Sequence, residues 1–141
     1  MNIVFYYSDC GEGPTSGGTW EMVFLYADWL KCAGNEVAIY SPREFVRDKT
    51  CSGVPLINSL GIANFHRAVS RNDVFICCTG AGEYVDLNQI TCKKILWSHC
   101  WDIYSKREDF DAVVALSPKH ARHLKTEYWC YNGYDSWWGL F

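Results

Sequence analysis

The opening of the chain constrains the fold more than any other stretch, because residues 1–41 predict one complete strand–loop–helix–strand unit. Residues 2–8 are a short apolar run of strand-forming side chains, and a glycine-rich loop covers 11–18. A helical segment over 19–33 is followed by a second strand over 36–41. A βαβ crossover of this kind requires parallel strands and is right-handed. We therefore expect a parallel sheet with helices on its faces.

The helix expected over 19–33 is apolar on more than one side. Thr19 is its expected N-cap and Gly34 its expected stop. The stripe expected to face the core comprises Trp20, Val23, Phe24, Ala27 and Leu30. A second apolar stripe beside it comprises Met22, Leu25, Tyr26 and Trp29. A surface helix does not need that much apolar area, so this helix is either buried on two sides or contacts a partner.

Strand and helix patterns alternate along the rest of the chain. Further strands are expected at 54–57, 73–78, 93–100, 111–117 and 128–131, a helical turn at 43–48, and helices at 61–70 and 118–127. The pattern predicts an α/β, Rossmann-like three-layer domain with a mostly parallel sheet of about six to seven strands. The expected strand order is 3-2-1-4-5-6. All of 1–141 reads as a single domain, since the length suits one core.

Composition excludes several classes of protein. A net charge of -3 and a pI near 5.7 argue against nucleic-acid binding, which needs a clustered basic surface. The sequence shows neither a signal peptide nor a transmembrane segment, so we expect a cytoplasmic protein, with a peripheral membrane position left open. Eight cysteines occur without any C-x-x-C or finger-like spacing. We expect free thiols that act as small core residues, with Cys77 and Cys78 pointing to opposite sheet faces.

Ligands of doubly wound sheets bind beyond the carboxyl ends of the strands, near the switch point. The candidate substrate-binding residues expected at that edge are Gly17, Gly18, Thr79, Gly80, Ser98 and Asn132. The glycine loop matches neither the dinucleotide fingerprint nor the P-loop spacing. It either binds phosphate at the start of the helix or only permits the turn, and the residues leave both alternatives open.

His99 is the histidine expected at the carboxyl end of a strand, where a base or a substrate hydrogen bond is useful. A structural histidine held by a backbone carbonyl is the alternative. His120 and His123 are three residues apart, but no third ligand is visible, and a solvated helix face is the simpler interpretation. We therefore predict His99 as the catalytic candidate, with no metal and no cofactor.

Three segments in order resemble the N-terminal domain of the retaining glycosyltransferase family 4, which has the two-domain GT-B fold. Gly17-Gly18 with residues 27–40 (ADWLKCAGNEVAIY) resembles the family's "GG…LA..L…GHEV.VY" start. Residues 113–124 (VVALSPKHARHL) resemble its "vialSpkhaehL" segment, and Asn132-Gly-Tyr-Asp135 resembles its "NGvD" turn. The resemblance implies transfer of a sugar from a nucleotide-sugar donor to a glycan or other hydroxyl acceptor, with retention and without a metal. Gly17 and Gly18 would then approach the donor diphosphate and the acceptor.

Two departures from that family stand out. The histidine that members often carry at the end of the strand expected at 73–78 is absent here. The sequence stops shortly after the NGxD turn, so the C-terminal donor domain with its Glu-x7-Glu motif is not present in it. We expect the isolated chain to be inactive. The alternative is a non-catalytic Rossmann-like binding module, or a subunit whose cleft a partner completes. A homo-oligomer or a partner domain is also expected from the apolar helix surface.

Overall fold

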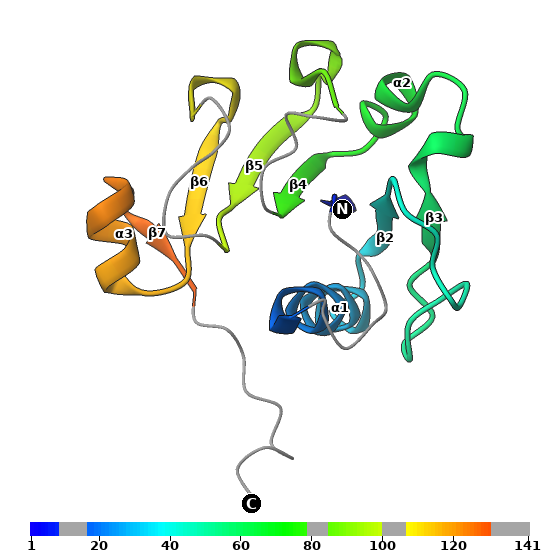
Figure 1. Ribbon diagram of the computed structural model, residues 1–141, viewed down its shortest axis with the longest axis horizontal. Coiled ribbons are helices and arrows are strands. Elements are labelled where there is room, and N and C mark those ends of the chain that lie inside the picture. Colours follow the sequence, from blue (N-terminus) through cyan, green and yellow to red (C-terminus); the bar gives the residue numbers. More distant parts are fainter. Residues whose placement is uncertain (9–16, 79–84, 100–106, 131–141) are drawn as a thin grey trace, which may run out of the picture.

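The computed structural model describes residues 1–8, 17–78, 85–99 and 107–130 (Figure 1). One sheet of seven strands runs through it, in the order β3-β2-β1-β4-β5-β6-β7, and every neighbouring pair is parallel. The strands are β1 (Asn2–Tyr7), β2 (Glu36–Ser41), β3 (Leu56–Asn58), β4 (Val74–Cys78), β5 (Lys93–Trp97), β6 (Ala112–Ala115) and β7 (Tyr128–Trp129). The α/β class and the strand order 3-2-1-4-5-6 are confirmed, and β7 extends that order beyond β6.

Helices cover both faces of the sheet and give three layers. The helices are α1 (Gly17–Cys32), α2 (Phe65–Val69) and α3 (Pro118–Leu124), with 3-10 turns η1 (Ser59–Gly61), η2 (Leu87–Gln89) and η3 (Arg107–Asp109). Among these described elements, α1 packs on one face, and α2, η2 and α3 pack on the other. None of the described helices combines the length and the apolar character needed to span a bilayer.

Alternation along β1 divides the core into two clusters, since successive side chains of a strand point to opposite faces. Phe5 packs with Val23 and Ala27 of α1, whereas Tyr6 packs with Phe65 of α2 on the other face. Each buried side chain of this size contributes about 1.5–3 kcal/mol. Cys77 and Cys78 continue the pattern on β4, as expected, with one thiol buried in each cluster.

The expected start of α1 was wrong, and its expected end was correct. The helix begins at Gly17, so Thr19 lies inside its first turn and is not the N-cap. At the other end Gly34 adopts φ +87, and its N–H donates to Lys31 O at 2.9 Å. Asn35 N donates to Leu30 O at 3.2 Å, which completes a Schellman motif. Gly34 therefore stops the helix, because a left-handed residue is required there.

Several element boundaries differ from expectation. No helical turn forms over 43–48, where the backbone only bends. The helix expected over 61–70 is limited to α2, with η1 before it. The strand expected over 93–100 ends at Trp97 as β5. The helix expected over 118–127 ends at Leu124, because Lys125 adopts a left-handed conformation with φ 53. Turn geometry decided these ends, and an apolar pattern does not report it.

Candidate ligand site at the carboxyl edge of the sheet

The strand order places a topological switch point between β1 and β4. The chain leaves β1 for α1 on one face, and it enters β4 from α2 on the other face. Crevices at such points, beyond the carboxyl ends of the strands, are where α/β sheets bind ligands. The carboxyl end of β5 is the next one along this edge, since β5 pairs with β4. A candidate site therefore starts from the residues that follow these three strands.

His99 lies at this edge, two residues beyond β5. Its ring is half-buried and packs edge-on against Trp97, with 4.3 Å between ring centroids. Its Nε2 atom is buried, and no group within the described part of the chain forms a hydrogen bond with it. A buried polar atom without a partner costs about 1–3 kcal/mol. His99 therefore places a hydrogen-bonding atom without a partner at the edge where ligands bind.

The surroundings of His99 favour its neutral form. Burial, with a smaller contribution from nearby His120, lowers the pKa of His99 from 6.5 to about 4. The ring is accordingly uncharged at neutral pH. A neutral imidazole can donate a hydrogen bond from one nitrogen and accept one at the other. A pKa this low makes the ring a weak base, so hydrogen bonding to an uncharged polar ligand suits it better than proton abstraction.

The predicted binding residues divide into those that the structure describes and those that it does not. Gly17 and Gly18 are the first two residues of α1, at the carboxyl edge. Ser98 is buried directly after β5, and its N–H donates to Val114 O at 2.9 Å. The remaining predictions, Thr79, Gly80 and Asn132, lie outside the described residues.

Two further serines at the same edge hold backbone in place. Ser41 is fully buried at the end of β2, and its hydroxyl accepts a hydrogen bond from Arg43 N at 3.1 Å. Ser117 is the N-cap of α3, and its hydroxyl accepts from His120 N at 3.1 Å. These bonds terminate β2 and start α3. Both side chains shape the edge of the sheet and are used structurally.

His120 contradicts the solvated helix face that its spacing with His123 indicates. The residue is 4% exposed, and its Nδ1 accepts a hydrogen bond from Leu116 N at 3.2 Å. An alternation of apolar and basic residues over the short α3 did not reveal which side faces the sheet. His123, in contrast, is exposed. The prediction was therefore wrong for His120 and correct for His123.

An aromatic row that sequence patterns did not reveal leads from α1 to His99. Trp29 and Tyr26 stack edge-on at 5.2 Å, and Tyr26 stacks on Trp97 at 4.8 Å. Trp97 in turn contacts His99. The signal was present in the second apolar stripe of α1, which includes Tyr26 and Trp29, but its partner on β5 is distant in the sequence. Burial raises the pKa of the neighbouring Cys130 thiol, and the adjacent Tyr26 and Trp97 side chains offset part of that rise.

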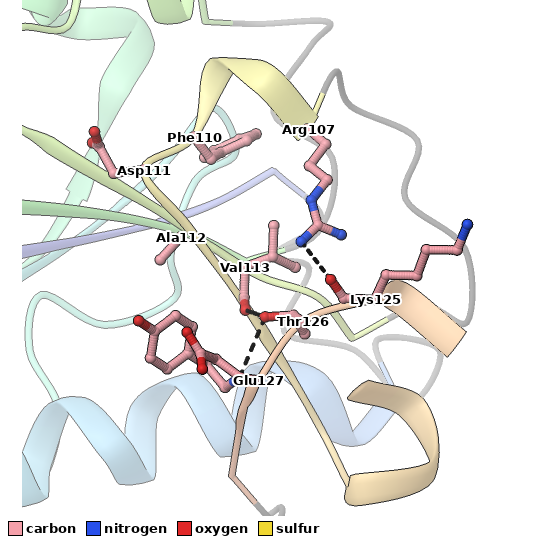
Figure 2. Close-up of a pocket in the computed structure, with 9 residues that line it drawn as sticks. Arg107, Phe110, Asp111, Ala112, Val113, Lys125, Thr126 and Glu127 are labelled. Atoms are coloured by element: carbon pink, nitrogen blue, oxygen red, sulfur yellow. Dashed lines mark hydrogen bonds between the residues drawn. The ribbon is translucent and has the colours of Figure 1, made fainter. Parts of the chain in front are cut away.

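A cavity of about 370 Å³ lies elsewhere, at the amino ends of β6 and β7 (Figure 2). Arg107 spans it and donates hydrogen bonds to the carbonyl oxygens of Leu124 and Lys125, the second at 2.9 Å. Thr126 donates to Val113 O at 2.7 Å and accepts from Tyr128 N at 3.3 Å. These bonds close the end of α3 and start β7. The cavity walls are therefore structural, on the edge opposite His99.

Metal ligands do not gather in the described ranges, where no three His, Cys, Asp or Glu side chains are placed to bind one ion. No protein-family model, curated protein or solved structure matches the chain.

Proposed function

We propose that the chain is the acceptor-side, Rossmann-like half of a GT-B glycosyltransferase, in an enzyme that transfers a sugar from a nucleotide-sugar to a hydroxyl acceptor. The proposal rests on the family 4 resemblance of three segments in order. The observation that supports it best is the unpartnered Nε2 of His99, at the sheet edge where α1 begins with Gly17-Gly18. The strand order is also the one expected for such a domain.

Sugar recognition fits the chemistry of this edge. Hydroxyl groups are neutral donors and acceptors, and a neutral His99 offers one group of each kind. A hydroxyl bound to the buried Nε2 would remove the cost of leaving that atom without a partner. Trp97 fixes the plane of the imidazole, so the nitrogen is oriented before the ligand arrives. The His99 ring is neutral, so no charge on it has to be desolvated when an uncharged sugar binds.

Binding of the nucleotide-sugar donor is assigned to the C-terminal domain of such an enzyme. In family 4 the nucleotide-sugar binds mainly to the C-terminal domain, and positive groups and dipoles there stabilise the leaving diphosphate. The part that we assign to Gly17-Gly18 is close approach to the diphosphate from the acceptor side, at the N-terminus of α1. His99 has the role of a substrate-binding residue that orients the acceptor or the transferred sugar.

The proposal predicts weak sugar binding without transfer by this chain alone. We would titrate ¹⁵N-labelled protein with methyl α-D-glucoside and methyl α-D-mannoside, and follow the amide signals of Gly17, Ser98 and His99. These signals should shift at millimolar glycoside. Calorimetry with UDP-glucose and GDP-mannose should give Kd values weaker than about 100 μM. No glycoside product should form.

A histidine pair provides the matched control. His99→Ala should remove the shifts, whereas His123→Ala, which changes an exposed histidine on α3, should preserve them. Micromolar binding of either nucleotide-sugar by this chain would contradict the proposal and indicate an autonomous donor site. Absence of any shift with both glycosides and both nucleotide-sugars would reject the sugar-binding role and favour a binding module of another kind.

A further inference from the structure

The connection between β2 and β3 folds back onto α1 as a short hairpin. Lys49 and Pro55 form an antiparallel bridge, and Gly53 N donates to Thr50 O at 3.0 Å across the turn. Gly53 adopts φ +80, a conformation that glycine favours. Cys51 and Ser52 are therefore the two central residues of a defined turn.

Asp28 of α1 holds this turn against the helix. Its Oδ1 accepts hydrogen bonds from the Thr50 hydroxyl and, at 3.3 Å, from Ser52 N. One helical turn further along α1, Cys32 Sγ lies 3.7 Å from the Ser52 hydroxyl. Residues four apart lie on one face of a helix, so Asp28 and Cys32 face the same turn. Cys32 thus contacts the residue that directly follows Cys51.

Exposure distinguishes these two thiols from the others. Of the six cysteines in the described ranges, Cys32 and Cys51 are exposed, and the rest are buried or half-buried. The expectation of small core residues is therefore correct for Cys77 and Cys78 and wrong for this pair. Both residues are accessible to a dissolved oxidant, at a point where the two chain segments touch.

We propose that Cys32 and Cys51 form a reversible disulfide that fastens the hairpin of the β2–β3 connection to α1. Bridged cysteines have Cα atoms about 4.4–6.8 Å apart, and consecutive Cα atoms are about 3.8 Å apart. Cys32 Sγ contacts Ser52, the neighbour of Cys51, so the bond requires the turn to rotate until Cys51 takes the place of Ser52 beside Cys32. The Asp28 contacts keep the turn, and with it Cys51, next to the part of α1 that carries Cys32.

The oxidant is a small-molecule disulfide such as oxidised glutathione. The Cys32 thiol loses its proton and attacks one glutathione sulfur, so a mixed disulfide forms and one glutathione thiolate leaves. The Cys51 thiolate then attacks Cys32 Sγ and releases the second glutathione. Two protons and two electrons pass from the cysteine pair to glutathione, which ends as two thiols. Reduced glutathione reverses both steps.

The bond would stiffen a segment that reaches the carboxyl edge of the sheet. Between Ser41 and the hairpin, Phe45 packs on Phe24 of α1 at 6.4 Å, and Arg47 lies over the same ring at 5.1 Å. A covalent bond at one end of this segment restricts its lifting from α1. It also closes a chain loop of about twenty residues, which lowers the entropy of the unfolded state.

Peptide mapping tests the bond directly. We would incubate reduced wild-type protein with oxidised glutathione, block free thiols and identify linked peptides by mass spectrometry without reduction. The expected result is a Cys32–Cys51 peptide and a Tm higher by about 5–10 °C than that of the reduced protein. Cys32→Ser and Cys51→Ser should each abolish the linked peptide and the rise in Tm. Cys92→Ser changes a half-buried thiol and should preserve both.

Three results would overturn the proposal. One is separate glutathione adducts on Cys32 and Cys51 without a linked peptide. The second is linkage of either residue to a cysteine other than its proposed partner, or between two chains. The third is a linked peptide that 10 mM reduced glutathione fails to cleave, since the bond would then not be reversible.

Discussion

Protonation of His99 costs more free energy than protonation of a histidine in water. The imidazole is buried beside Trp97 and lies close to His120. Its protonated form is poorly solvated there, so the pKa of His99 falls from 6.5 to about 4. Between these two values the unfolded chain binds a proton that the folded chain does not bind. The free energy of unfolding therefore falls as the pH drops through this window, and above pH 6.5 the effect is absent.

We predict that His99→Gln removes this part of the pH dependence. Between pH 7 and pH 5 the wild type should lose about 2 kcal/mol more stability than the variant, since pH 5 lies well below the unfolded pKa of 6.5 and above the folded pKa of about 4. Urea unfolding at the two pH values measures the difference. His123→Gln, at an exposed position, is the control. Equal losses in wild type and His99→Gln would show that His99 titrates normally.

Residue type and local position were enough to predict some single side chains and not others. Alternation on a strand predicted that Cys77 and Cys78 face opposite clusters, as they do. The burial of His120 depends on which side of α3 faces the sheet, and a seven-residue helix carries too few apolar positions to define that side. The exposure of Cys32 and Cys51 depends on how a hairpin folds back, which composition does not encode.

At the scale of elements, long apolar runs were predicted well and element ends were not. The buried runs that became β1, β4 and β6 were recognised because parallel strands covered on both faces are apolar throughout. The end of α1 was recognised because glycine readily adopts the left-handed conformation that stops a helix, as Gly34 does. The helical turn predicted over 43–48 was wrong. Phe45 packs on Phe24 of α1 from an irregular segment, and an apolar residue in that setting is not distinguished from one on a helix by sequence.

The stop of α1 gives a prediction at this scale. Gly34→Ala should destabilise the fold by about 1 kcal/mol, because alanine is strained at φ +87 although nothing lies within 4 Å of the added methyl group. Thermal unfolding should show a Tm lower by about 2–4 °C. Gly61→Ala adds a methyl group in equally open space without a positive φ, so it should change stability by less than about 0.5 kcal/mol. An equal effect at both positions would rule out backbone strain as the cause.

For the molecule as a whole, the strand order followed from the alternation of elements, and the full composition of the site did not. The order is fixed because right-handed crossovers between parallel strands allow few topologies. The expected position of Ser98 and His99 directly after β5, at the carboxyl edge, is confirmed, whereas their role in binding stays a prediction. The aromatic row behind His99 was not predicted, because Tyr26 and Trp97 come from segments distant in the chain and meet only when α1 packs on the sheet. The substrate class remains a prediction that rests on the family 4 resemblance.

Exposed aromatic side chains on the surface of the molecule predict that it self-associates. Trp29 on α1 is 47% exposed, and Tyr128 and Trp129 on the edge strand β7 are 53% and 45% exposed. The two elements are neighbours, since Cys130, which follows β7, lies beside Tyr26 of α1. Burial of each large aromatic side chain is worth about 1.5–3 kcal/mol. We therefore expect the chain to form a homodimer or a larger oligomer, or to cover this surface with its own apolar residues 137–141, which lie outside the described ranges.

Light scattering over a hundredfold range of protein concentration separates these outcomes. A mass of two chains or more is expected for the wild type, and Trp29→Ser should lower it toward one chain by removing the most exposed aromatic of α1. A Trp137→Ser, Trp138→Ser double variant tests the tail. If the tail covers the surface, the wild type is monomeric and the double variant associates.

Leu60→Ser on η1 removes a 73% exposed apolar side chain from another part of the fold and should leave the mass unchanged. A monomer in the wild type and in every variant would show that these aromatics remain in water, and the expectation of a partner surface would then be wrong.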